Sequence, residues 1–333
     1  MSEVLISQIY NAFDPKQPLD PNDPFYVNCQ AVRGDANIIN EVGRNIVLAN
    51  QPTYQLYTGH RGVGKSTELR RLRQYLEQQG RKVIYFEATD DLDDMDAQYT
   101  DILLSYTRHL IEELQGAANP GPLISWLSSR WQSLKDLALT EVEFDKLELS
   151  AQTAQFAKLT TTLRQVPSTR QRIREQVDIH SVSLIEALNN FIAEAEKNLN
   201  AQELVIIVDN LDRIGLIHRE GGKTNHDEIF IDYSTLMCKL NCNVVCTAPI
   251  SLVYSERASR LRDSYGTIHV LPMVMVRQQD GTVHPPGLEK MKELIQQRVG
   301  QFTGRALVPE VFESEEVLNY LCLMSGGHMR ELM

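Results

Sequence analysis

Residues 57–72, YTGHRGVGKSTELRRL, place three glycines, a lysine and two neighbouring hydroxyl side chains within one short segment. The stretch 53–59 has strand character, and the stretch 66–80 that follows the glycines has helical character. The segment matches the pattern G-x-x-x-x-G-K-[ST] at Gly59, Gly64, Lys65 and Ser66. A strand followed by this pattern and a helix indicates a loop that binds phosphate, whereas the alternative is a glycine-rich turn that binds no ligand.

Each residue type in this loop has a physical role in holding phosphate. Glycines allow positive φ, which turns successive backbone amides inward as an anion-binding nest, and the following helix adds the positive end of its dipole. We expect Lys65 to bind the β- and γ-phosphates of a nucleotide, Ser66 to coordinate Mg²⁺, and Thr67 to contact the α-phosphate. The predicted cofactor-binding residues are Gly59, His60, Arg61, Gly62, Val63, Gly64, Lys65, Ser66 and Thr67.

Further apolar stretches with strand character alternate with helical stretches along the chain. They are 82–88, 203–209, 242–248 and 267–276. Pro272 makes the last of them an edge strand or a bulge. Strands separated by helices predict an α/β fold, in which helices cover both faces of a parallel sheet. The segment 90–201 has almost no strand character and is too long for one crossover, so we predict a large helical insertion there.

Apolar periodicity predicts the positions of several helices. They are 35–51, 97–114, 122–139 and 181–198. Ser168 and Gln171 have capping-box spacing and predict the start of another helix. The acidic run 90–96 lacks the glycine and the final glutamate of an EF-hand, so we expect a solvated loop that caps the next helix.

A group of arginines makes the insertion locally basic, either as a solvated helix face or as a grip on nucleic acid. These are Arg164, Arg170, Arg172 and Arg174.

The stretch LVIIVDNLDRI, 204–214, ends an apolar run at Asp209. A phosphate site of this kind needs a second carboxylate for the metal, at the end of a buried strand. The stretch resembles a Walker B segment, which assigns Asp209 to Mg²⁺ together with Ser66. The alternative is a strand-end aspartate that caps a turn.

Together, the loop, this carboxylate and the next strand resemble the additional-strand P-loop ATPases, which include the AAA+ and STAND groups and their origin-recognition-like, KAP-like and NACHT-like members. In AAA+ proteins a glutamate usually follows the Walker B aspartate and polarises the attacking water, whereas this chain has Asn210, which cannot accept a proton. DNLDR, 209–213, is similar to the ending found in STAND and KAP-type NTPases, which assigns water positioning or activation to Asp212. The alternative is that Asp212 forms a salt bridge with Arg213 or another neighbour.

The same resemblance implies further candidate catalytic residues. CNVVCTA, 242–248, is similar to a sensor-1 strand, which directs Thr247 to the γ-phosphate unless this threonine only ends the strand. SGGHMREL, 325–332, resembles a sensor-2 turn, which places Arg330 over the nucleotide. An arginine finger would come from a helix that otherwise has an ordinary solvated face, through Arg257, Arg260 or Arg262.

Three parts are predicted: a lead-in with a helix at 1–50, an ATPase core at 51–277, and a helical lid at 278–333 that we expect to be cut short. Within the first part, Arg33 and Ile38 lie in a segment that resembles the one packing beside adenine. A guanine signature, [NT]KxD after a strand, is absent from the sequence, which favours ATP.

The net charge of −11 argues against a protein that coats nucleic acid, because that function needs a basic face. Five cysteines without framework spacing favour a reducing compartment. The sequence has no apolar run of membrane-spanning length and no signal-peptide pattern at its start. We therefore expect a cytoplasmic location and no membrane partner.

Three functions are compatible with these features. The first is a STAND-like or AAA+-like switch that binds ATP and Mg²⁺, hydrolyses ATP slowly, and forms homo-oligomers in response to nucleotide and an unknown protein or nucleic-acid trigger. The resemblance suggests a role in bacterial conflict or antiviral signalling. The second is a DNA-associated AAA+ ATPase of the origin-binding or transposition-regulator type. The third is a nucleotide-binding scaffold in which Asn210 has disabled hydrolysis.

Overall fold

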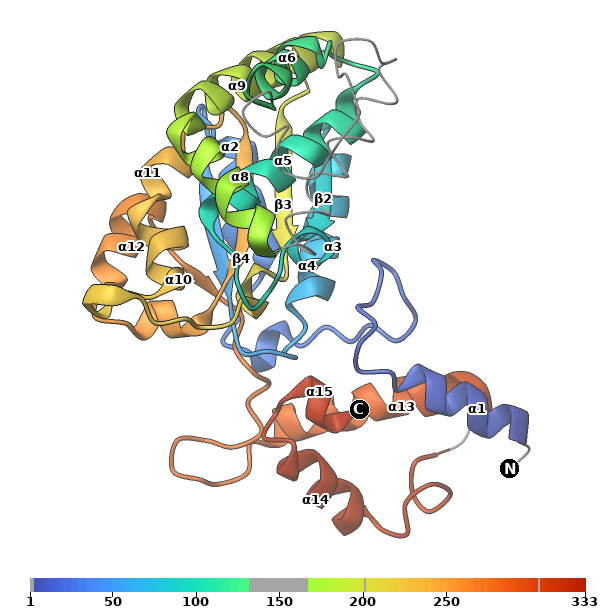
Figure 1. Ribbon diagram of the computed structural model, residues 1–333. Helices are drawn as coiled ribbons and strands as arrows, with labels where there is room; N and C mark the ends of the chain where they lie inside the picture. The colour runs from blue at the N-terminus through green and yellow to red at the C-terminus, as the bar shows by residue number, and fades with distance from the viewer. Residues whose placement is uncertain (1–2, 132–166, 201, 305) are drawn as a thin grey trace. The chain divides into compact units, whose positions relative to one another are not determined.

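The computed structural model describes residues 3–131, 167–200, 202–304 and 306–333 (Figure 1). The chain divides into two compact units, each with its own apolar core. Unit 1 comprises Met1–Asn45, Tyr57–Tyr75 and His269–Met333. Unit 2 comprises Ile46–Leu56 and Leu76–Ile268. The predicted division at residues 50 and 277 stays a prediction.

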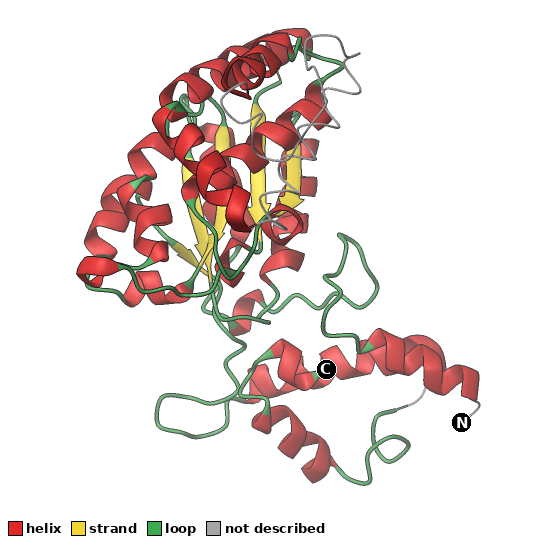
Figure 2. Cartoon of the chain, in the orientation of Figure 1, coloured by secondary structure: helices red, strands yellow, loops and turns green. Residues whose placement is uncertain are grey.

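Five strands form one sheet (Figure 2). Parallel neighbouring strands need a crossover connection between them, which is why helices separate the strands along the chain. The order across the sheet is β2 (Lys82–Glu87), β3 (Leu204–Asp209), β4 (Asn243–Ala248), β1 (Tyr54–Thr58) and β5 (His269–Val270). Strands β2 and β3 pair in parallel from Lys82 opposite Leu204 to Glu87 opposite Asp209. Every residue of β3 and β4 is buried, as expected for central strands covered on both faces. The predicted α/β fold with a parallel sheet is confirmed.

Strand β5 is much shorter than the stretch 267–276 that has strand character in the sequence. It lies at the edge of the sheet and pairs with β1 only at two positions, where His269 lies opposite Tyr57 and Val270 opposite Thr58. Pro272 has no N–H to donate, so the pairing cannot continue through it. The predicted edge position of this strand is confirmed, and its predicted length is wrong.

The described part of the insertion is helical, as predicted. Its helices are α4 (Ala88–Asp91), α5 (Tyr99–Leu114), α6 (Gly121–Trp131), α8 (Pro167–Ile179) and α9 (Ser181–Asn198). Residues 132–139 of the predicted helix 122–139 lie outside the described residues. Ser168 is the second residue of α8, and Pro167 lies in the first turn, where a missing N–H costs no hydrogen bond.

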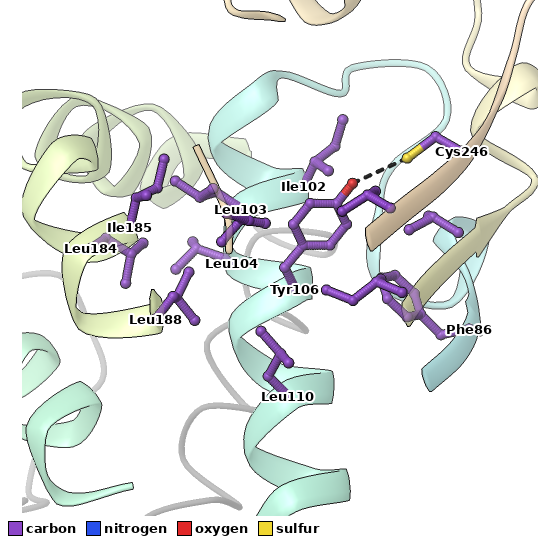
Figure 3. Packing of buried hydrophobic residues seen from close by; sticks show 14 of the residues in the cluster. Phe86, Ile102, Leu103, Leu104, Tyr106, Leu110, Leu184, Ile185, Leu188 and Cys246 are labelled. Atoms are coloured by element: carbon purple, nitrogen blue, oxygen red, sulfur yellow. Dashed lines mark hydrogen bonds between the residues drawn. The ribbon is translucent and has the colours of Figure 1, made fainter. Parts of the chain in front are cut away.

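Helix α5 is central to the core of unit 2 and is buried along most of its length. It contacts β2, α8 and α9. In Figure 3, Leu103 and Leu104 of α5 lie toward Leu188 of α9, while Tyr106 extends toward Cys246 of β4. The Tyr106 hydroxyl lies 3.2 Å from the Cys246 Sγ, which gives the buried hydroxyl a partner. A helix enclosed in this way links the insertion to the sheet.

The remaining helices and turns of unit 2 are short. They are η5 (Leu211–Arg213), η6 (Glu220–Gly222), α10 (Asn225–Asp227), η7 (Glu228–Asp232), α11 (Ser234–Met237), η8 (Ile250–Tyr254) and α12 (Ala258–Tyr265). Helix α2 (Arg44–Leu48) leads into this unit and ends before Pro52.

Unit 1 is built around a long helix near the C-terminal end of the chain. Its elements include α1 (Glu3–Ala12), η1 (Gln30–Val32), η2 (Ile39–Gly43), most of α3 (Lys65–Gln78), β5, α13 (Pro285–Thr303), α14 (Glu315–Met324) and α15 (Met329–Leu332). Buried Met291 and Leu294 of α13 belong to the same apolar cluster as Val32 and Leu318. The buried Arg298 guanidinium donates to the Ala12 carbonyl at 3.0 Å, which ties the N-terminal segment to α13. The helical character predicted for 278–333 is confirmed.

Two local expectations are wrong for identifiable reasons. The helix predicted at 35–51 begins only at Ile39, because Gly34 and Asp35 have φ of 66° and 59° and interrupt helical geometry. The acidic run 90–96 is not fully solvated: the Asp91 side chain is 1% exposed and accepts hydrogen bonds from Ser105 and His109. Helix α5 is capped instead by the reciprocal capping box of Gln98 and Asp101.

The arginines of the insertion do not form one solvated face. Arg170 and Arg174 are buried and pair with acidic residues, while Arg172 is exposed. Arg170 Nη2 lies 2.8 Å from Asp93 and Arg170 Nη1 lies 2.7 Å from Asp96. Arg164 lies outside the described residues. Among the helices of the described residues, none is both long and apolar enough to cross a bilayer.

Candidate functional site

In unit 1, the glycine-rich loop connects the end of β1 at Thr58 to the start of α3 at Lys65, as the sequence predicts. Gly62 and Gly64 have φ of 88° and 101°, a left-handed geometry that residues with a Cβ rarely adopt. Val63 is fully buried between them and anchors the loop. The first backbone amides of α3 have no partner within the helix, so the loop and the helix start can both donate to an anion.

Lys65 is 6% exposed, and its ammonium group contacts the backbone of the loop. The Nζ atom donates to the carbonyl oxygens of Gly59 at 2.8 Å and His60 at 2.9 Å. These carbonyls hold the charge beside the amides on which a phosphate would bind. In the next turn, the Thr67 hydroxyl accepts a hydrogen bond from the backbone of Leu19 at 3.2 Å. The predicted roles of Ser66 and Thr67 toward a ligand stay predictions.

The C-terminal turn of the chain lies directly on this loop within unit 1. The backbone N–H of Arg330 donates to the Gly62 carbonyl at 3.2 Å, and the His328 ring contacts the Arg61 carbonyl. A Cβ added to Gly62 would lie 2.4 Å from the His328 ring and 2.7 Å from the Arg330 Cβ. The structure thus brings Arg330 to the loop, and Gly62 has no room for a side chain there.

His328 did not stand out in the sequence analysis, although its side chain also caps α15 by accepting from the N–H of Glu331 at 3.3 Å. The sequence feature that could have indicated His328 is its position two residues before Arg330. A lone histidine of this kind has no spacing pattern by which sequence reasoning could select it.

Arg33 also reaches the loop within unit 1. Its guanidinium donates to the Val63 carbonyl at 2.6 Å and lies 3.2 Å from the Met329 sulfur. The Nε atoms of Arg33 and Arg330 are both buried and have no hydrogen-bond partner among the described residues. Two unsatisfied cationic donors beside a loop of inward-facing amides fit a site for an anionic ligand.

In unit 2, Asp209 ends β3 and is 1% exposed. One carboxylate oxygen accepts from the Tyr85 hydroxyl at 2.8 Å, and the other accepts from the Asn210 N–H at 2.7 Å. The two neutral donors fix the orientation of the carboxylate. Carboxylate oxygens such as these are hard ligands of the kind that suits Mg²⁺, and the predicted pairing of Asp209 with Ser66 stays a prediction. Among the described residues, no group of three or more His, Cys, Asp and Glu side chains is arranged to hold a metal ion.

Asn210 occupies the position at which the AAA+ resemblance expects a glutamate. Its backbone has φ of 63°, and its amide Nδ2 donates to the Glu87 Oε2 at 2.6 Å. Glu87 ends β2 and lies opposite Asp209 in the sheet register. The sequence analysis missed Glu87, and the available signal was an acidic residue at the end of the apolar strand 82–88.

The other strand-end candidates also lie in unit 2. Thr247 of β4 is fully buried, and its hydroxyl accepts a long hydrogen bond from the N–H of Asp212 at 3.4 Å. Arg257 forms ion pairs with Asp232 at 2.5 Å and Asp227 at 3.3 Å. Arg260 and Arg262 are exposed on α12. The intramolecular pairs occupy the charge of Arg257, and the finger assignment stays a prediction.

A protein family described as the AAA ATPase domain matches residues 46–216, which is about half of the chain. This chain belongs to that AAA ATPase family. The match contains both the glycine-rich loop of the AAA ATPase domain and Asp209 at the end of β3. The additional strand β4 lies between the strands that carry these two features, which agrees with the predicted P-loop ATPase class.

Solved structures similar to this AAA ATPase domain include two archaeal proteins. The Orc1 protein of Aeropyrum pernix, solved in complex with DNA, is 15% identical, with a TM-score of 0.44 and coverage of 96% of this chain and 60% of that chain. Cdc6p of Pyrobaculum aerophilum is 12% identical, with a TM-score of 0.45 and coverage of 97% and 62%. The chain therefore spans less than two thirds of the length of either protein. No curated protein matches this sequence.

Proposed function

We propose that this AAA ATPase domain is a molecular switch that binds and hydrolyses Mg·ATP and changes its assembly with nucleotide state. The observation that carries the proposal is the contact of the turn 328–330 with the glycine-rich loop. We expect phosphate binding at the loop amides to change the surroundings of a segment that is hydrogen-bonded to the carbonyls of Arg61 and Gly62. Binding therefore acts on the C-terminal turn through a direct contact.

In this proposal each part of the site has a distinct task. The loop amides and the Lys65 ammonium bind the β- and γ-phosphates, and Arg330 and Thr247 act on the γ-phosphate. Ser66 and Asp209 would hold Mg²⁺, which supplies positive charge to the phosphate oxygens. Asp212 positions the attacking water, as the resemblance of DNLDR to the STAND and KAP-type ending implies.

Assignment to the STAND class, rather than to another AAA+ branch, rests on the DNLDR stretch, 209–213, and on Asn210. A role in bacterial conflict or antiviral signalling is the biological context that this class suggests. Hydrolysis is proposed to be slow, because Asn210 replaces the glutamate that AAA+ proteins usually carry directly after the Walker B aspartate.

The deciding experiment is calorimetric titration of the folded chain with ATP and Mg²⁺, and then with ADP. We expect binding by the parent and a loss of at least about tenfold in affinity for Lys65→Ala, since a charge-assisted hydrogen bond contributes about 1.5–3 kcal/mol. Lys16→Ala removes an equal charge from the exposed lead-in and serves as the matched control. Circular dichroism checks that each variant is folded.

A folded parent that takes up no adenine nucleotide, or a Lys65→Ala variant with parental affinity, would contradict the proposal. Steady-state turnover separates the switch from a scaffold that binds ATP without hydrolysing it. A rate that rises with duplex DNA and falls steeply with added salt would instead support the DNA-associated alternative.

A further inference from the structure

Glu87 presents a carboxylate beside Asp209 and Asn210, at the end of β3 in unit 2. It lies opposite Asp209 in the register of β2 and β3, and its Oε2 accepts from the Asn210 amide at 2.6 Å. Tyr85, two residues earlier on β2, donates to Asp209 at 2.8 Å. Because residues two apart on a strand share a face, Glu87 lies on the same face of the sheet as the Tyr85 contact.

Asn210 explains why this carboxylate comes from the neighbouring strand. The backbone at Asn210 is left-handed, with φ of 63°, and asparagine adopts this conformation more readily than glutamate does. An amide at this position cannot accept a proton, but it can donate a hydrogen bond. Here it donates to a group that can accept a proton, the carboxylate of Glu87.

We propose that Glu87 is the catalytic carboxylate that accepts the proton of the attacking water, and that Asn210 is the residue that positions it. This inference rests on the proposed ATP hydrolysis. In the step, the water oxygen forms a bond to the γ-phosphorus, and the bond from that phosphorus to the β–γ bridging oxygen breaks. Its electron pair stays on ADP, the water proton passes to Glu87, and the products are ADP and inorganic phosphate. Glu87 is partly exposed, so it can return the proton to solvent.

Glu87 and Asp212 have different roles in this step. Asp212 lies in η5, after β3, and its backbone N–H donates to the Thr247 hydroxyl. In this arrangement Asp212 orients water or the γ-phosphate, and Glu87 changes its protonation state during the reaction. A purely structural Glu87 would instead affect folding and nucleotide affinity together. The ratio of hydrolysis rate to affinity therefore distinguishes the two roles.

The test compares Mg·ATP affinity with the single-turnover hydrolysis rate in Glu87→Gln, Glu87→Asp, Asp212→Asn and the parent. Glutamine keeps the size of residue 87 and its hydrogen bond with Asn210. We expect Glu87→Gln to bind within about threefold of the parent and to hydrolyse at least about 100-fold more slowly, since a general base contributes about 10²–10⁴-fold. Glu87→Asp keeps a carboxylate and should recover part of the rate.

Asn210→Gly supplies a second, independent variant, because glycine keeps the left-handed backbone and removes the amide that holds Glu87. We expect parental affinity with a hydrolysis rate between those of the parent and Glu87→Gln. Glu113→Gln, at an exposed carboxylate that pairs with Lys82, should leave both quantities unchanged.

Hydrolysis by Glu87→Gln within threefold of the parental rate would overturn the inference, as would a parent that binds ATP but never turns it over. A fall in affinity as large as the fall in rate would assign Glu87 a structural role and also overturn it. A parent that fails to bind ATP is a different result, because it removes the proposed function itself.

Discussion

At the scale of single residues, backbone conformation decides which side chains the candidate site tolerates. Gly62 and Asn210 both have positive φ, one in the glycine-rich loop of unit 1 and the other after the β3 strand of unit 2. At Gly62 the requirement is both conformational and steric, since His328 occupies the space of a Cβ. At Asn210 it is conformational, and a side chain that forms a specific hydrogen bond is retained.

Replacing Gly62 by alanine should therefore destabilise the contact between the loop and the turn 328–330. A left-handed backbone costs a residue with a Cβ about 1–2 kcal/mol, and the added atom would lie 2.4 Å from the His328 ring. We expect lower stability in urea unfolding, by about 1–2 kcal/mol or more. Gly116→Ala is the control, since Gly116 has no atom within 4 Å of an added Cβ. Equal stabilities of the two variants would contradict this account.

His226 should make the stability of unit 2 depend on pH. Burial lowers the pKa of His226, whose Nε2 lies 2.9 Å from the Ile214 carbonyl and whose Nδ1 is buried without a partner among the described residues. The neutral ring donates through Nε2 to the Ile214 carbonyl, and protonation would place a charge on a ring that burial removes from water. Since the pKa is lower in the folded state, this stability is fully present above the unfolded pKa of about 6.5 and is lost as pH falls from there through the lowered pKa of the folded state.

The measurement is urea unfolding at about pH 8 and about pH 5.5, on either side of the ordinary histidine pKa. His226→Gln should lose less stability than the parent between these two conditions, because it removes the titrating group. His218→Gln, at an exposed histidine, should lose as much as the parent. A His226→Gln variant with the parental pH dependence would show that other groups are responsible.

At the scale of elements, the insertion is joined to the core by buried ion pairs as well as by apolar packing. Arg174 of α8 donates to Asp101 at the start of α5 at 3.0 Å and to Asp96 at 3.0 Å. Arg170 binds the same acidic loop. The sequence predicted a solvated acidic loop and, separately, a basic helix face that was either solvated or a grip on nucleic acid. Their pairing places α8 against the loop that follows α4.

Arg174→Ala should destabilise unit 2 by about 3 kcal/mol, because removing one partner leaves a buried carboxylate without its counter-charge. Arg172→Ala removes an equal charge from the exposed face of the same helix and should change stability by no more than about 0.5 kcal/mol. Denaturant unfolding followed by far-UV circular dichroism measures both. A loss of equal size in the two variants would exclude a specific contribution from the buried pairs.

At the scale of the whole molecule, the proposed switch predicts assembly that depends on nucleotide. We expect the mass measured by size-exclusion chromatography with light scattering to increase with ATP or a slowly hydrolysed analogue, and to return to the smaller value with ADP. Arg330→Ala should lose this increase even at ATP concentrations that saturate the variant, whereas Arg277→Ala, at an exposed arginine of unit 1, should behave as the parent. A monomer that ignores both nucleotide and DNA would contradict the switch and its DNA-associated alternative.

The sequence alone determined the features that depend on residues close together in the chain. The loop from Gly59 to Ser66 and the apolar runs of the strands are local patterns, because φ preference, strand character and helix start each depend on a few neighbouring residues. The α/β class, the strand positions apart from the length of β5, and the helical insertion followed from them. The exact helix starts did not, since Pro167 and the left-handed Asp35 act through local geometry that periodicity does not detect.

Only the tertiary structure decided which distant residues meet. Glu87 and Asn210 are 123 positions apart, and they meet because β2 pairs with β3 in one particular register. Arg330 reaches Gly62 across most of the chain, through the folding of unit 1. Strand order and register depend on the packing of the whole core rather than on any one segment. A residue whose role depends on a neighbour distant in the sequence therefore has no local motif that identifies it.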